Sequence, residues 1–159
     1  MKNVALSEAC PQSDAEYFEC PSREQMLTSL GLETLLERAE DGYSGETLVI
    51  VHDPDDGRVG FLSYFWGSCS GCDSVYGASS YEDAEEIRSG LRESINWAKS
   101  RAELRAWIDT PAWDLAHEFN DSAKEFKRLA LEMLPALCVV HDDCKGNEAL
   151  AAECFRSRT

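Results

Sequence analysis

Two stretches decide the fold: Thr-Leu-Val-Ile-Val at residues 47–51 and Val-Gly-Phe-Leu-Ser-Tyr-Phe-Trp at residues 59–66. The first is short, apolar and β-branched, which is typical of a buried strand. Between them, residues 53–57 read Asp-Pro-Asp-Asp-Gly, in which proline presets φ, the aspartates bond the local backbone and glycine accepts a positive φ. The pattern predicts an antiparallel hairpin at about residues 46–66.

Helical patterns precede the hairpin. Ser22 and Gln25 have the spacing of a capping box, which predicts the start of a helix. Gly31 is expected to bend or break this helix, but the leucines at positions 32, 35 and 36 keep a helical spacing. We therefore expect helical structure to continue until Asp41 and Gly42 end it.

Further helices are predicted after the hairpin. One begins at Tyr81 and is capped by Ser80 with Asp83, and another follows Ser100. Residues 95–97 between them fit either a helix end or a short strand. Residues 110–133 carry a long helical stripe that Asn-Asp-Ser at residues 120–122 could divide. Pro135 disrupts it, and a short apolar run at 137–140 and a last helix capped by Asn147 are expected beyond.

Length and composition indicate one folded domain. The 159 residues are 43% hydrophobic and include four tryptophans, enough for a real core. We expect a helix-rich α+β domain with a small antiparallel sheet over residues 22–159, preceded by an irregular arm over residues 1–21. No apolar run approaches the roughly 20 residues of a membrane helix, and the first residues lack a secretory signal, which predicts a cytoplasmic protein.

The charge restricts the classes of partner. Thirty acidic residues against fifteen basic ones give a net charge of −15. Such a surface repels phosphate backbones and anionic lipids, so direct binding of nucleic acids or membranes is disfavoured, whereas a protein with a basic face is attracted. The same charge is also consistent with a role in solubility alone.

Two groups of carboxylates are the candidate partner-binding residues. One lies on the hairpin turn, which is too short for the calcium loop of an EF-hand. The other lies at the start of the helix from Tyr81, where the helix dipole explains two acids but not four in five residues, and where carboxylates could imitate phosphates. The residues are Asp53, Asp55, Asp56, Glu82, Asp83, Glu85 and Glu86.

The most distinctive motif is Gly-Ser-Cys-Ser-Gly-Cys-Asp at residues 67–73. Its two cysteines can point their sulfurs at one centre, as a tetrahedral metal or a dithiol–disulfide couple requires. The third interpretation is a tight structural turn with two packed thiols. The chain has seven cysteines, an odd number, and its size requires no disulfides, so reduced thiols are expected.

Zinc is the alternative cofactor for this loop. A structural zinc site needs four ligands, so a second pair must come from a cluster more than sixty residues away. The candidate metal ligands are Cys69, Cys72, Cys138, His141 and Cys144.

Redox catalysis is the less favoured interpretation of the loop. An aromatic strand followed by Cys-x-x-Cys resembles thioredoxin over about a dozen residues. Thioredoxin-like proteins begin a helix at the second cysteine, whereas residues 73–77 are poor helix material, and Asp73 would raise the pKa of neighbouring thiols. No nucleophile or nucleotide-binding motif occurs elsewhere. The sequence therefore favours a protein that is not an enzyme, with thiol chemistry left open.

The loop at residues 67–73, with the aromatic strand before it and an acidic helix and Ile-Asn-Trp at 95–97 after it, resembles a group of uncharacterised proteins from bacteriophages and bacteria. The resemblance covers about residues 46–108 and implies a mobile-element setting, in which small acidic proteins often bind host machinery. We therefore expect an acidic protein of the host cytoplasm that binds and inhibits a basic, nucleic-acid-binding host protein. The alternative is a zinc or thiol-redox protein that uses Cys69 and Cys72.

Overall fold

The predicted hairpin forms the centre of the computed structural model, which describes residues 4–11, 18–69, 73–118 and 120–135. Strands β2 (Ser44–His52) and β3 (Val59–Gly67) pair antiparallel along their whole lengths. In the turn between them Gly57 has a φ of 75°, a conformation that glycine adopts without strain. The hairpin is confirmed, with its turn chemistry as expected.

Two further strands complete an antiparallel sheet of order β1-β2-β3-β4. Strand β1 (Glu33–Ala39) pairs with β2 over most of its length. Strand β4 (Asn96–Ala98) is much shorter and pairs only with Val59–Phe61 at the start of β3. In the described part of the chain, the outer edge of β3 from Leu62 onward therefore has no strand beside it.

The prediction that helical structure continues beyond Gly31 is wrong. Helix α2 (Arg23–Ser29) has the expected capping box, in which Ser22 and Gln25 bond each other's backbone. Gly31, at a φ of 80°, then turns the chain into β1. A β-bulge between Thr34 and Leu36 interrupts the two-residue alternation of the strand, and the adjacent Leu35 and Leu36 both pack against the same core. Leu32 precedes the strand and belongs to the other core, so the helix-like spacing of the three leucines does not come from a helix.

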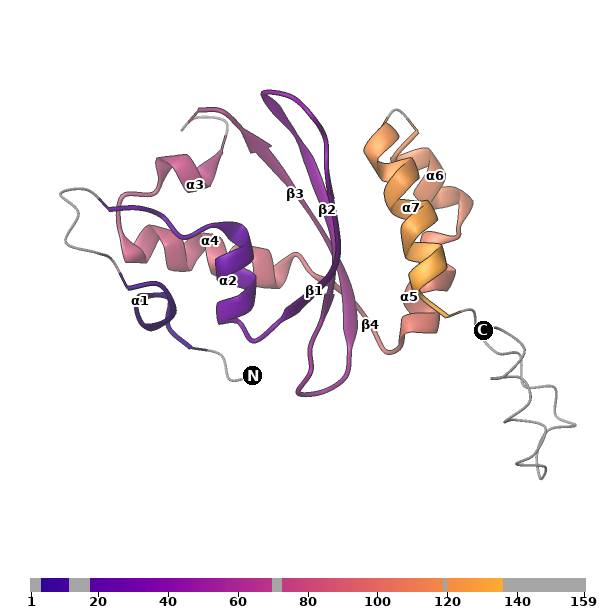
Figure 1. Ribbon diagram of the computed structural model, residues 1–159, viewed down its shortest axis with the longest axis horizontal. Coiled ribbons are helices and arrows are strands. Elements are labelled where there is room, and N and C mark those ends of the chain that lie inside the picture. The colour runs from indigo at the N-terminus through magenta and orange to yellow at the C-terminus, as the bar shows by residue number, and fades with distance from the viewer. Residues whose placement is uncertain (1–3, 12–17, 70–72, 119, 136–159) are drawn as a thin grey trace, which may run out of the picture.

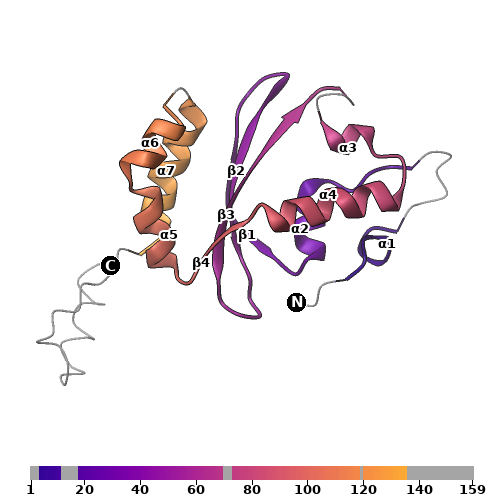
Figure 2. The same cartoon turned by 180° about the vertical axis from the view of Figure 1, so that it is seen from behind.

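Helices cover both faces of the sheet (Figures 1 and 2). One face carries α1 (Leu6–Ala9), α2, α3 (Ser74–Gly77) and α4 (Tyr81–Glu93). The other carries α5 (Arg101–Ile108), α6 (Pro111–Ala116) and α7 (Asp121–Met133). The described residues thus form an α+β domain, which confirms the predicted fold class.

Several local predictions are settled by these helices. The N-terminal segment expected to be irregular contains α1, whose Leu6 is fully buried. Asn120 caps α7 and so divides the long helical region as expected. Residues 137–140 and Asn147 lie outside the described residues. Within the described ranges, no helix is both long and apolar enough to cross a bilayer.

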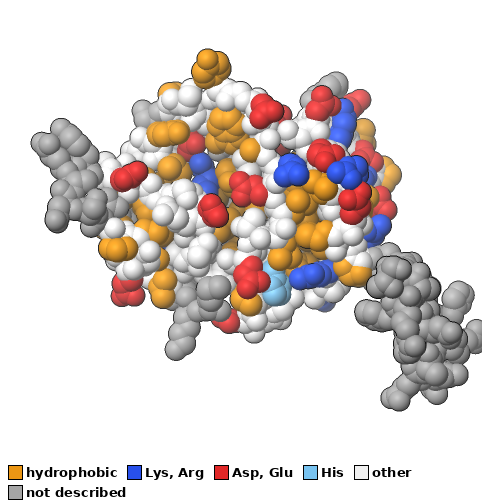
Figure 3. Space-filling model, viewed as in Figure 1, with side chains coloured by type: hydrophobic (Ala, Val, Ile, Leu, Met, Phe, Trp, Pro, Cys, Tyr) orange, Lys and Arg blue, Asp and Glu red, His pale blue; other side chains and the backbone are white. Residues whose placement is uncertain are grey.

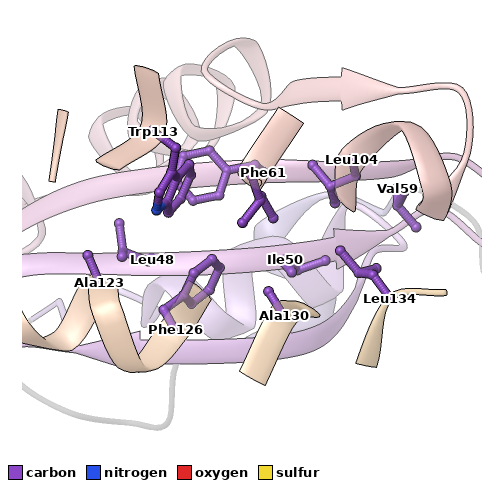
Figure 4. Packing of buried hydrophobic residues seen from close by; sticks show 11 residues of the cluster. Leu48, Ile50, Val59, Phe61, Leu104, Trp113, Ala123, Phe126, Ala130 and Leu134 are labelled. Atoms are coloured by element: carbon purple, nitrogen blue, oxygen red, sulfur yellow. The ribbon is translucent and has the colours of Figure 1, made fainter. Parts of the chain in front are cut away.

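The sheet has a hydrophobic core on each face. Leu48, Ile50 and Phe61 point toward α5–α7, where Phe61 meets Trp113 edge-on at 4.9 Å between ring centroids (Figure 4). Val49 and Leu62 point the other way, toward α2 and α4. All four residues Leu48–Val51 are completely buried, so this apolar run is shielded on both sides.

Candidate functional site

A groove of about 620 Å³ lies between the outer part of β3, the region of α3, and α4. We call it the β3–α4 groove. Tyr64 and Phe65 line it from the strand, Gly77 from α3, and Asp83, Glu86 and Gly90 from α4. It runs along the part of β3 that β4 leaves without a neighbour.

One face of α4 forms the long wall of this groove. Positions 83, 86, 87, 90, 91 and 94 line it, and they recur at the three- and four-residue spacing of one helix face. Asp83 and Glu86 place carboxylates at its N-terminal end, and Leu91 supplies apolar surface further along. Gly90 is exposed, and a Cβ atom built on it meets no described atom within 4 Å. The middle of the wall is therefore open.

The backbone of β3 faces this groove at every second residue. The N–H and C=O groups of one strand residue point to the same side. Glu46 lies opposite Phe65, and its backbone N–H and C=O both bond to Glu40 on the β1 side. The Phe65 carbonyl instead accepts a hydrogen bond from Arg23 Nη2 at 3.4 Å. Phe65 and Ser63 therefore direct their backbone groups away from β2, toward the open edge.

Asp73 holds the end of the groove in place. Its carboxylate receives both Nη atoms of Arg23, at 2.6 and 3.1 Å, and the backbone N–H groups of Gly67 at 3.4 Å and Val75 at 2.9 Å. Only 4% of the Asp73 side chain is exposed, against 12% for Arg23. This Arg23–Asp73 clamp joins the start of α2, the end of β3 and the start of α3.

The clamp corrects one expectation about residues 73–77 and determines the charge of Asp73. Asp73 accepts the Val75 N–H and thereby caps α3, so the segment predicted to be poor helix material forms a short helix. Burial alone would raise the pKa of Asp73, but hydrogen bonds from Arg23 and from two backbone N–H groups outweigh it, so the pKa lies below its usual value of 3.8. The resulting negative charge pairs with Arg23. Burial raises the pKa of the Cys20 thiol, and the charge of Asp73 adds to this increase.

The carboxylates of the hairpin turn lie far from the groove. The turn precedes Val59, whereas Tyr64 and Phe65 line the groove five and six residues further along β3, or about 17–20 Å in an extended strand. Asp53 and Asp56 both pair with Arg58 and accept backbone N–H groups within the turn. These two aspartates stabilise the turn, and the two predicted groups of acids do not form one surface.

The carboxylates of α4 divide among different surroundings. Glu85 pairs with Arg88 at 2.7 Å and accepts the Leu6 N–H at 3.0 Å, so it faces α1. Hydrogen bonds from the Ser79 backbone and hydroxyl hold the pKa of Asp83 below its usual range. Glu82 and Glu86 are exposed. Of the seven predicted partner-binding residues, the structure places Asp83 and Glu86 on the groove.

The thiol predictions are only partly covered by the structure. Cys69 is exposed and disulfide-bonded, in place of the reduced thiol expected. Cys72, Cys138, His141 and Cys144 lie outside the described residues. Within the described ranges, no three His, Cys, Asp or Glu side chains are grouped to hold a metal ion. Zinc binding stays a prediction.

Sequence reasoning missed Arg23, Tyr64 and Phe65. Arg23 lies 50 residues from Asp73, and its guanidinium stacks 4.8 Å from the centre of the Tyr64 ring. No local sequence pattern predicts either contact. Phe65 is 75% exposed on a strand whose apolar residues otherwise point inward. The run of aromatic residues was visible, but not which of them faces solvent.

Comparison with protein-family models, with curated proteins and with solved structures finds no match.

Proposed function

We propose that this protein is a small acidic interaction protein that binds a basic, nucleic-acid-binding protein of its host and inhibits it. The observation that carries the proposal is the pair of carboxylates, Asp83 and Glu86, on the wall of an open groove in a chain of net charge −15. Carboxylates presented in this way attract the basic surface that would otherwise bind phosphates.

The distribution of basic side chains supports a basic rather than an acidic partner. In Figure 3 they gather over the α5–α7 side of the view. Three on α7 are already paired: Lys124 with Asp121, Lys127 with Asp114, and Arg128 with two glutamates. Among the described residues, Glu82 and Glu86 on α4 have no basic partner within 4 Å. The exposed carboxylates of Glu82 and Glu86 are therefore available to a cationic partner.

Affinity capture from a bacterial lysate tests the proposal. We expect the protein to retain basic proteins, to release them as ionic strength rises, and to suppress their binding to DNA or RNA in a gel-shift assay. Glu86→Lys should weaken capture, whereas Glu118→Lys, an equal charge change at an exposed position just beyond α6, should leave it near the wild-type level. Capture of acidic proteins only, or binding indifferent to salt, would refute the proposal.

The second candidate is a thiol-dependent function, favoured by the disulfide at the exposed Cys69. Cys69→Ser separates the two candidates, because it leaves the charge of the α4 wall untouched. Loss of partner capture in this variant, with the fold intact by circular dichroism, would favour the thiol. Stoichiometric zinc by mass spectrometry of protein purified without added metal would favour the metal alternative.

A further inference from the structure

We propose that the β3–α4 groove binds an extended segment of the partner, with alternating basic and apolar residues, as an additional strand along the outer edge of β3. This inference rests on the proposed function and specifies how the partner is recognised. The peptide backbone would pair with Ser63 and Phe65, and its basic side chains would face the acids of α4.

The strand edge supplies the first part of the argument. Strand β4 pairs with β3 only at Val59–Phe61, so the described chain leaves the next residues of β3 without a neighbour. The backbone groups of Ser63 and Phe65 point to this side. Arg23 reaches the carbonyl of Phe65 and Asp73 accepts the N–H of Gly67, which leaves the N–H and C=O of Ser63 and the N–H of Phe65 for an added strand. Backbone donors and acceptors left without a neighbouring strand on a sheet edge are the usual template for strand addition.

The shape of the groove supplies the second part. The edge from Ser63 to Gly67 spans about 13 Å, the length of about four extended residues. The groove of about 620 Å³ lies beside this edge and continues over Gly90, where the helix surface is open. An extended chain therefore has room between the strand and α4.

Charge identifies the occupant. Arg23 is the one cation among the described residues of the groove wall, and Asp73 neutralises it through two short bonds. Asp83 and Glu86 leave the groove negative, so it favours Lys or Arg side chains directed toward α4. A second copy of this chain, itself at −15, would be repelled.

The two faces of the sheet predict the pattern of the bound segment. Side chains of an added strand alternate between the α4 face and the opposite face. On the opposite face they would lie beside Phe65, which is 75% exposed and offers apolar contact. Basic residues toward α4 would therefore alternate with apolar residues toward Phe65.

A synthetic peptide, Lys-Val-Lys-Val-Lys-Val-Lys, tests the inference by amide chemical-shift changes in ¹⁵N-labelled protein. We expect shifts at Ser63, Phe65 and Gly90, and no binding of the matched Glu-Val peptide. Two further peptides carry N-methyl groups on every lysine or on every valine, which removes the N–H donors from one strand edge or the other. Because only one edge can face β3, one of these peptides should lose affinity at least tenfold while the other keeps it.

Variants of Gly90 provide the matched test on the protein. Gly90→Leu places a bulky side chain at a position where a Cβ atom meets no described atom within 4 Å, and it should weaken peptide binding about tenfold, whereas Gly90→Ala should change it less than about twofold. Equal binding of both N-methylated peptides would overturn strand addition while leaving charge-driven recognition intact. Absence of Lys-Val peptide binding at millimolar concentration would also overturn it. The proposed function is tested separately, by partner capture.

Discussion

Among single residues, Asp73 connects the most distant parts of the structure. Its carboxylate holds Arg23 from α2 and the backbone of both β3 and α3. We expect Asp73→Ala to lower the free energy of unfolding by about 3 kcal/mol, because Arg23 would be left largely buried without its partner. Urea unfolding measures this, and Asp41→Ala in the exposed β1–β2 turn is the control. A loss no larger than that of the control would contradict the clamp.

The pKa of Asp73 also predicts a pH dependence. Because the pKa in the folded state lies below the usual 3.8, the carboxylate contributes stability that is fully present above that value and is lost as pH falls through the folded pKa. The stability difference between the wild type and Asp73→Asn should therefore be constant from about pH 7 to 5 and shrink below about pH 4. A stability difference that grows on acidification would show that the pKa of Asp73 is not lowered in the folded protein.

At the level of elements, α4 carries a glycine in its interior that the fold does not require. A Cβ atom on Gly90 would meet no described atom within 4 Å, and glycine disfavours helix interiors. Gly90→Ala should therefore raise the free energy of unfolding by about 0.5–1 kcal/mol. Thermal unfolding followed by circular dichroism measures the change. Destabilisation would mean that the open space beside α4 is not present in solution.

Gly60 in β3 is the opposite case. A Cβ atom there would clash with Cγ2 of Ile95 and lie 3.0 Å from the Trp97 ring. Gly60→Ala should therefore lower the free energy of unfolding by about 1–3 kcal/mol, since β4 must move away to admit the methyl group. The same unfolding assay serves both glycines, and an unchanged stability for Gly60→Ala would show that β4 packs less closely than described.

For the whole molecule, the net charge of −15 implies self-repulsion that salt should relieve. We expect the melting temperature to rise by about 3 °C between low salt and about 0.5 M sodium chloride, as a gain of roughly 1 kcal/mol would produce in a domain of this size. A variant with Glu82 and Glu118 changed to lysine should show a smaller increase. A melting temperature that falls with added chloride would contradict this account.

The hairpin could be predicted because its signals are local. Asp53 and Gly57 define the turn through their own conformations, and the strand residues beside it are apolar and β-branched. Strand β1 could not be predicted in the same way, because Leu32 before the strand and Leu35 and Leu36 at its bulge happen to have a helical spacing although they pack in two different cores. Its pairing with β2 is a tertiary contact that overrides the local pattern.

The candidate site, too, could be predicted only where its signals are local. The acids of α4 follow from the sequence, since Asp83 and Glu86 stand at the start of a recognisable helix. The open edge of β3 does not, because it depends on β4 pairing with only three residues. The partner of Asp73 lies 50 residues away, and no spacing rule connects it to Arg23.

The burial of β2 and β3 on both faces has a consequence for biosynthesis. Leu48, Ile50 and Phe61 are covered by α5–α7, and the central side chain of that cover, Phe126, follows Phe61 by about 65 residues. At a ribosomal rate of about 5–20 residues per second, this apolar sheet face stays uncovered on the order of several seconds. The nascent chain therefore presents a chaperone-binding surface that the finished protein no longer has.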